Sequence, residues 1–186
     1  MAETPDDHLL LERFRDPATR EAAFNELVLA YQQRIYWHVR RMVISHSDAD
    51  DLVQEVFIRI WNNLDSFKGN SQLFTWIYRI ATNECLSFLK RKKMRHTVSL
   101  DSEENPLVEK LREDPYINGN ELQMKLQEAI LTLPEKQRMV FNLRYFEDLK
   151  YEELSEILDT SVGALKASYH HAVKKLEKYL TERSTE

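Results

Sequence analysis

The chain has 186 residues, of which 42% are hydrophobic and 31% charged, with a formal net charge of −5. This length suits one large or two small domains, and the apolar content excludes a globally disordered protein. A single cysteine, Cys85, excludes an internal disulfide and a multi-cysteine zinc site, and three glycines and five prolines disfavour a turn-rich β fold.

The N-terminal residues MAETPDDHLL lack a basic stretch followed by a long apolar run, so no signal peptide is expected. No window approaches the roughly 18 consecutive apolar residues of a membrane span. Together with the single cysteine, these features predict a cytoplasmic protein with no direct membrane insertion.

Three amphipathic helices are predicted in the first half of the chain, because apolar residues recur there at three- and four-residue steps. They cover residues 20–42, 49–64 and 71–94, and Ser47 or Asp48 is the candidate N-cap of the second. Residues 65–70 form a loop, in which glycine and asparagine are the turn signals.

The second predicted helix has two chemically different faces. Its apolar stripe includes Val53, Phe57 and Ile60. The opposite face presents the acidic and amide side chains Asp50, Asp51, Gln54 and Glu55, together with Arg59. A solvated helix surface is the ordinary interpretation of such a face.

Residues 97–120 differ from both flanks, with two prolines, a glycine and six acidic residues against two basic ones after residue 98. They are interpreted as an acidic linker with one short helical turn at 107–111. Regular patterns resume with helices at 121–133 and 134–146, separated by Leu133-Pro134 because the residue before proline is pushed out of the helical region.

Two short helical patterns at the end of the chain, residues 149–158 and 162–180, are separated by Asp159-Thr160-Ser161. Ser161 stands at the N-cap position of the second helix. That helix carries Lys166, His170, His171, Lys174 and Lys175. The arrangement suggests a helix-turn-helix that reads DNA, and the alternative is a helical hairpin with a solvated charged face.

The predicted fold is therefore all-α. It consists of an N-terminal helical bundle at residues 1–96, the flexible acidic linker at 97–120, and a C-terminal four-helix domain at 121–186 with the helix-turn-helix. A dense basic run ends the bundle and comprises Lys90, Arg91, Lys92, Lys93 and Arg95. A protein that binds DNA strongly by itself is usually more basic than this chain, so either it does not bind DNA or a larger partner supplies most of the affinity.

The order of three motifs resembles the extracytoplasmic-function (ECF) sigma factors, the two-domain members of the sigma-70 family. The motifs are DADDLVQEVFIRIW, FTWIYRIATNECLSFLKRKK and LPEKQRMVFNLRYFEDLKYEELSEILDTSVGALKASYHHAVKKL. The resemblance covers about Arg20 to Leu180. It implies a non-enzymatic protein that binds core RNA polymerase and directs initiation at promoter DNA, and it also implies an anti-sigma factor as a further partner.

The resemblance assigns Asp51, Gln54 and Glu55 to docking on the clamp helices of the largest polymerase subunit. It assigns a second set to recognition and melting of the −10 element, where a base extruded from the stack needs polar groups and an apolar wall. That set is Ser66, Phe67, Lys68, Asn70, Arg79, Asn83, Lys90, Arg91, Lys92 and Lys93, with Phe74 as an alternative wall. Core packing is the competing role for the aromatic residues, and a solvated helix end is the competing role for the basic run.

A third set is assigned to the −35 element and lies on the predicted recognition helix and its cap: Ser161, Lys166, Ala167, His170, His171 and Lys174. This helix has no arginine, so the bidentate guanine contact that arginine makes best is not available. Adjacent helical residues diverge by roughly 100°, which disfavours a metal site at His170-His171. No metal or cofactor is expected.

Other classes of protein fit less well. An enzyme is disfavoured because the chain has no glycine-rich phosphate loop, no HExxH and no nucleophile elbow. A helix-turn-helix regulator would require a sensor domain in the N-terminal half. A sigma-like interaction module without initiation activity stays open on the sequence alone.

Overall fold

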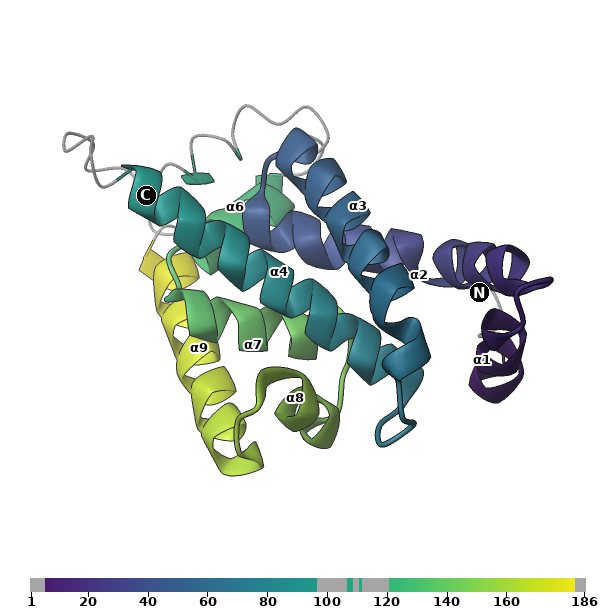
Figure 1. Ribbon diagram of the computed structural model, residues 1–186. Helices are drawn as coiled ribbons and strands as arrows, with labels where there is room; N and C mark the ends of the chain where they lie inside the picture. The colour runs from purple at the N-terminus through teal and green to yellow at the C-terminus, as the bar shows by residue number, and fades with distance from the viewer. Residues whose placement is uncertain (1–5, 97–106, 109–110, 112–120, 183–186) are drawn as a thin grey trace.

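The computed structural model describes residues 6–96, 107–108, 111 and 121–182. Throughout this part of the chain the regular elements are helices, as predicted, and none is a strand. They are α1 (Asp7–Arg15), α2 (Arg20–Val43), α3 (His46–Asn63), a 3₁₀ turn (Leu64–Ser66), α4 (Leu73–His96), α6 (Glu121–Leu131), α7 (Glu135–Tyr145), α8 (Tyr151–Leu158) and α9 (Val162–Glu182), shown in Figure 1.

The N-terminal half is a bundle in which α2 contacts α1, α3 and α4. One stripe of each helix is buried, since a helix returns to the same face every three or four residues. The shared core includes Leu27, Ile35 and Val39 from α2, Leu52, Val56 and Ile60 from α3, and Ile77, Ala81 and Cys85 from α4. Each fully buried Leu or Ile side chain contributes about 1.5–3 kcal/mol of hydrophobic stabilisation.

The helix boundaries of this half agree with the sequence pattern except at two places. The N-cap of α3 is Ser45, whose Oγ accepts a hydrogen bond from the Asp48 N–H at 3.3 Å, so the expected cap at Ser47 or Asp48 is wrong. Helix α1 was not expected, because it buries only Leu10 and Phe14, and an isolated helix of this length is unstable without tertiary packing.

The C-terminal half packs α6, α7 and α8 against the long helix α9. Its own core consists of Ala129, Ile130, Leu133, Phe141, Ala172 and Leu176. Tyr145, at the end of α7, is 53% exposed, and its ring stacks on Phe141 with a centroid distance of 5.2 Å. The predicted linker 97–120 lies outside the described residues apart from Leu107, Val108 and Leu111, which are helical.

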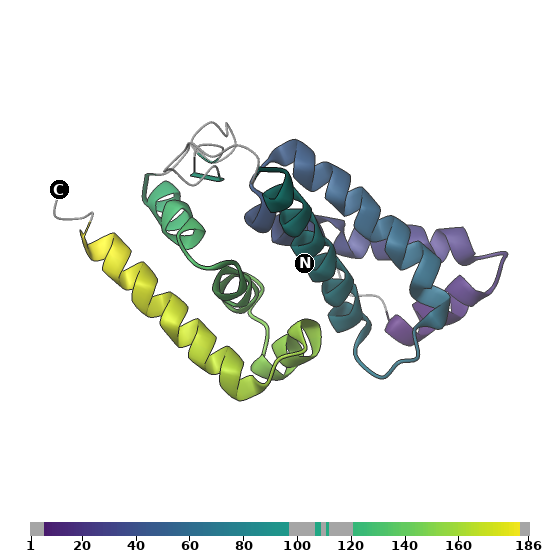
Figure 2. The same cartoon turned by 60° about the vertical axis from the view of Figure 1, so that its left-hand side comes forward.

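The two halves lie against each other, with α8 on α4 and α7 on α2. Figure 2 shows the purple-to-teal half beside the green-to-yellow half. One buried cluster continues from the N-terminal core into the C-terminal half, where it takes in Leu143, Leu149, Leu154 and Ile157. The helical patterns predicted each half separately but did not predict this interface.

A buried histidine lies beside the interface. His38 of α2 is fully buried, and its Nε2 is 3.1 Å from the Thr82 hydroxyl of α4. Burial, together with the positive charge of Arg41, lowers the pKa of His38 to about 3. The imidazole is therefore neutral in the folded protein at ordinary pH.

This burial predicts a pH dependence of stability. In the unfolded chain His38 takes up a proton near its ordinary pKa of about 6.5. Above that pH the histidine is neutral in both states, so the free energy of unfolding is not reduced by its burial. Below it, the free energy of unfolding should fall by up to about 1.4 kcal/mol per pH unit, until the folded pKa near 3 is reached. Urea unfolding between about pH 7 and about pH 4.5 should give a shallower slope for His38→Gln than for the wild type. An equal pH dependence of the free energy of unfolding in the two proteins would contradict the lowered pKa of His38.

Candidate nucleic-acid and partner interfaces

The acidic and amide face of α3 is open to solvent. Asp51, Gln54 and Glu55 are all exposed, whereas Leu52 and Val56 of the same helix are buried in the bundle. This separation follows from the helical period, which places the polar positions away from the core stripe. The three side chains are thus placed where another protein can contact them.

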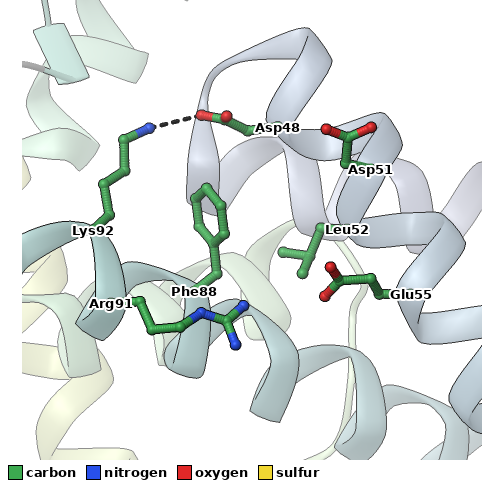
Figure 3. A pocket seen from close by; sticks show the side chains of 7 residues that line it. All are labelled: Asp48, Asp51, Leu52, Glu55, Phe88, Arg91 and Lys92. Atoms are coloured by element: carbon green, nitrogen blue, oxygen red, sulfur yellow. Dashed lines mark hydrogen bonds and ion pairs between the residues drawn. The ribbon is translucent and has the colours of Figure 1, made fainter. Parts of the chain in front are cut away.

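A cleft of about 580 Å³ joins this face to the start of the basic run, as Figure 3 shows. Asp48, Asp51 and Glu55 of α3 form one wall, and Arg91 and Lys92 of α4 form the other. Leu52 and Phe88 line the cleft between them. The Lys92 Nζ lies 2.6 Å from Asp48 Oδ2 and 5.3 Å from the centroid of the Phe88 ring. Residues that the sequence predicted for polymerase docking, Asp51 and Glu55, therefore line the same cleft as Arg91 and Lys92, which it predicted for −10 DNA.

The connection between α3 and α4 exposes Ser66, Lys68 and Asn70. Gly69 has φ +73°, which a residue without a Cβ adopts without strain. Phe67 behaves differently: only 7% of it is exposed, and its ring packs on Trp76 at 5.4 Å. In this structure Phe67 anchors the loop to the core rather than presenting a surface for a base, because an apolar ring in a polar loop gains most by burial.

The other wall candidate, Phe74, is half-buried with its ring 4.5 Å from that of Tyr78. Beside the loop, Ser66 and Asn83 line one shallow cleft of about 290 Å³ together with Asn63 and Arg59. The sequence assignment left out Asn63 and Arg59. Their exposed positions on α3 were the one sequence signal for them. The cleft itself forms by the packing of α3 on α4, which no local pattern predicts.

The cationic side chains of α4 fall into two groups. Lys90, Arg91 and Lys93 are exposed near its C-terminal end, and Lys92 is partly buried by its contact with Asp48. Arg79, near the other end, reaches the C-terminal half, where its Nε donates to the Glu156 carbonyl oxygen at 2.8 Å and its Nη2 donates to the same oxygen. The structure thus spreads the predicted −10 residues along the helix rather than gathering them at one point.

The helix-turn-helix has the expected local geometry. Helix α8 ends at Leu158 and is capped by Asp159 with φ 48° and ψ 49°, the left-handed conformation that ends many helices. The Ser161 Oγ then accepts a hydrogen bond from the Ala164 N–H at 3.4 Å at the start of α9. A tight turn results, and α9 runs along the outside of the C-terminal half (Figure 1).

One face of α9 is exposed and polar, and it carries Lys166, Ala167, His170, His171 and Lys174. Leu165, Ala172 and Leu176 are buried on the other face. His171 and Lys174 also line a groove with Lys175, Lys178 and Gln137 of α7. The sequence assignment left out Gln137, whose amide oxygen accepts a hydrogen bond from Lys175 Nζ at 3.1 Å.

Comparison with known proteins gives matches over most of the chain. Sigma-70 region 2 matches residues 27–95, and sigma-70 region 4 matches residues 123–176. The ECF RNA polymerase sigma factor SigW of Bacillus subtilis is 33% identical over 168 residues, which are 86% of this chain and 90% of that protein. The ECF RNA polymerase sigma-E factor of Escherichia coli is 34% identical over 180 residues, which are 92% of this chain and 93% of that protein.

Solved structures share the fold. CnrH in complex with the cytosolic domain of CnrY aligns with a TM-score of 0.69 at 21% identity, covering 95% of this chain and 97% of that one. The sigma factor RpoE of Bartonella quintana in complex with the anti-sigma factor NepR aligns with a TM-score of 0.67 at 23% identity, covering 85% and 96%.

A helical bundle followed by a helix-turn-helix half, with matches to sigma-70 regions 2 and 4, places the chain among the DNA-binding transcription proteins. The chain belongs to the ECF sigma factors of the sigma-70 family. Its function is accordingly that of a sigma factor, which binds core RNA polymerase and directs initiation at promoter DNA; sigma factors are non-catalytic initiation factors. Region 2 occupies the N-terminal half, where a sensor-type regulator would need a sensor domain.

Among the described helices, none has the length and apolarity to cross a bilayer.

Proposed function

We propose that Asp51, Gln54 and Glu55 dock this sigma factor on the clamp helices of the largest polymerase subunit. The observation that carries this proposal is that all three polar side chains are exposed on one face of α3, opposite the stripe that holds α3 in the bundle. An acidic and amide surface of this kind complements a basic groove and steers association electrostatically. The protein has no reaction of its own in this scheme, and we place it in the cytoplasm with the polymerase.

We further propose that the two halves recognise two promoter elements in different physical states. The exposed face of α9 suits an intact major groove, which is about 12 Å wide and admits one helix. The polar loop at residues 66–70, together with the cleft beside it, suits a base extruded from a melted duplex. The basic run near the C-terminal end of α4 then contacts the backbone phosphates.

An anti-sigma factor is the proposed regulator. The Bartonella quintana RpoE is in complex with the anti-sigma factor NepR, and CnrH is in complex with the cytosolic domain of CnrY. The same fold in this chain supports a partner of the same class.

The direct test of the proposed function is run-off transcription with core polymerase on a library of promoters. Promoter-specific transcripts that require this protein are expected. A protein that binds core polymerase but yields no specific transcript would instead be an interaction module.

Charge reversal on α3 tests the docking surface. Asp51→Lys combined with Glu55→Lys should weaken association with core polymerase at least about tenfold, because like charges then face the basic groove. Stability should change by less than about 1 kcal/mol, since both positions are exposed. Surface plasmon resonance with immobilised core polymerase measures the affinity, and circular dichroism measures the fold. Glu12→Lys with Glu21→Lys, at exposed positions on α1 and α2, is the matched control with the same charge change. Equal affinities of the two double variants would refute the assignment.

Two alanine variants test the division of labour between the halves. His171→Ala should reduce initiation about fivefold on promoters with an upstream element, the loss expected from one base contact of about 1 kcal/mol, and should matter little on templates without that element. Asn70→Ala should instead slow promoter opening and alter the preference at one downstream base. Run-off transcription and permanganate footprinting distinguish these effects, with His8→Ala and Asn25→Ala as exposed controls. Impaired melting in His171→Ala with an upstream defect in Asn70→Ala would reverse the assignment.

A further inference from the structure

Helix α1 lies outside the part of the chain that matches sigma-70 region 2, which begins at residue 27. It is nevertheless firmly anchored, because Phe14 is fully buried and its ring meets the Trp61 ring of α3 edge to face at a centroid distance of 5.3 Å. Helix α1 contacts α2 and also the 3₁₀ turn at Leu64–Ser66. Because this turn leads into the polar loop at residues 66–70, α1 stands next to that loop.

An arginine holds the start of the loop. Arg20, the first residue of α2, donates from Nη2 to Asp65 Oδ2 at 2.5 Å and from Nη1 to Asp65 Oδ1 at 3.3 Å. Its guanidinium carbon lies 4.1 Å from the centroid of the Phe14 ring and 5.1 Å from that of Trp61. A cation in the first turn of a helix is unfavourable, because the helix N-terminus carries a partial positive charge. The carboxylate and the two rings offset this effect and fix the guanidinium in place.

The end of the loop meets α1 directly. Asp7, the first residue of α1, lines a cleft of about 420 Å³ together with Gln72 and Phe74. Burial raises the pKa of Asp7, and a hydrogen bond from the Leu73 backbone N–H opposes this rise. Leu73 is the first residue of α4, so Asp7 accepts from one of the N–H groups that a helix leaves unsatisfied at its start.

The middle of the loop has an anchor of its own in Phe67, which packs on Trp76. The loop is thus held at its start, middle and end, while Ser66, Lys68 and Asn70 stay exposed. A site that is ordered before its ligand arrives loses less conformational freedom on binding. The contacts from α1 and the start of α2 therefore favour capture of a base by these exposed groups.

We propose that Arg20 and Asp7 are positioning residues for the opening of the downstream promoter element, and that they hold the loop at 66–70 in the conformation that receives the extruded base. This inference rests on the function proposed above for that loop. Arg20 acts through Asp65 at one end, and Asp7 acts through the Leu73 N–H at the other. No sequence motif assigned a role to either residue.

Removing one partner of the Arg20–Asp65 pair is the central experiment. Arg20→Gln should slow promoter opening by up to about fivefold, because a surface ion pair shifts a two-state equilibrium by no more than about this factor. It should also alter the preference at the same downstream base as Asn70→Ala, while affinity for core polymerase stays at the wild-type value. A loss of folded protein would instead lower initiation by the same factor on all templates.

The matched control is Arg13→Gln. Arg13 of α1 pairs with Glu26 of α2 at 2.7 Å, so this variant makes the same charge change and also removes an ion pair that holds α1. The pair joins α1 to α2 rather than to the loop, so opening and base preference should match the wild type. Hydrogen exchange of the full chain, followed by mass spectrometry, should be faster at residues 65–72 in Arg20→Gln and unchanged there in Arg13→Gln.

Further variants test each end of the loop. Asp65→Asn should reproduce Arg20→Gln, and combining the two should add nothing, since both remove the same pair. The Asp65 side chain is 52% exposed, so Asp65→Asn keeps the test available if Arg20→Gln does not fold. At the other end, Asp7→Ala should speed exchange of the loop and slow opening. Asp7→Asn should restore both, because the amide oxygen still accepts from the Leu73 N–H.

Three results would overturn the proposal: unchanged loop exchange and base preference in both Arg20→Gln and Asp65→Asn, effects of these two that multiply in the double variant, or the same changes in Arg13→Gln. If Asn70→Ala itself leaves opening and base preference unchanged, the proposed function of the loop is refuted and this inference with it. Slower opening in Asn70→Ala beside wild-type behaviour of Arg20→Gln refutes only the positioning role.

Discussion

Helix α4 is buried on two sides, and the rest of the structure depends on this constraint. One side packs on α2 and α3 through Ile77, Ala81 and Cys85, while α8 lies against another side. Because α4 cannot leave either neighbour without exposing buried surface, it fixes where the loop at 66–70 and the basic run stand. It also places Tyr78 and Arg79 at the junction, where the C-terminal half supplies their acceptors.

Several cationic groups in the described part of this sigma factor are held by acceptors within the chain. Lys92 pairs with Asp48, Arg59 with the buried Glu84, and Arg41 with Glu147. Ion pairs between fully exposed side chains contribute at most about 1 kcal/mol to stability, but Glu84 and Glu147 are buried and the Lys92–Asp48 pair is partly buried. A buried pair such as the one at Glu147 is different, because an uncompensated charge would remain on each side if the halves separated without new partners.

The cleft between α3 and α4 brings the proposed polymerase surface and part of the proposed DNA surface within reach of each other. Asp48 holds Lys92, and Asp51 and Glu55 line the same cleft. In the proposed functions, a basic polymerase partner on α3 competes with Lys92 for Asp48, and the proposed polymerase docking and proposed DNA contact are linked at this cleft.

The sequence by itself determined the helices, because their apolar residues repeat with the helical period and the turn signals stand between them. It also placed Asp51, Gln54 and Glu55 on an exposed face and Ser161 at the cap of α9, since period and capping are local properties. Tertiary structure alone decided the rest. Phe67 lies in a loop with no periodicity, and its burial depends on Trp76 nine positions later. Helix α1 needs the bundle to be stable, and Glu147 meets Arg41 across 106 positions of chain. No local pattern encodes such a contact, because it exists only when α2, α4 and the connection between α7 and α8 have been brought together by packing.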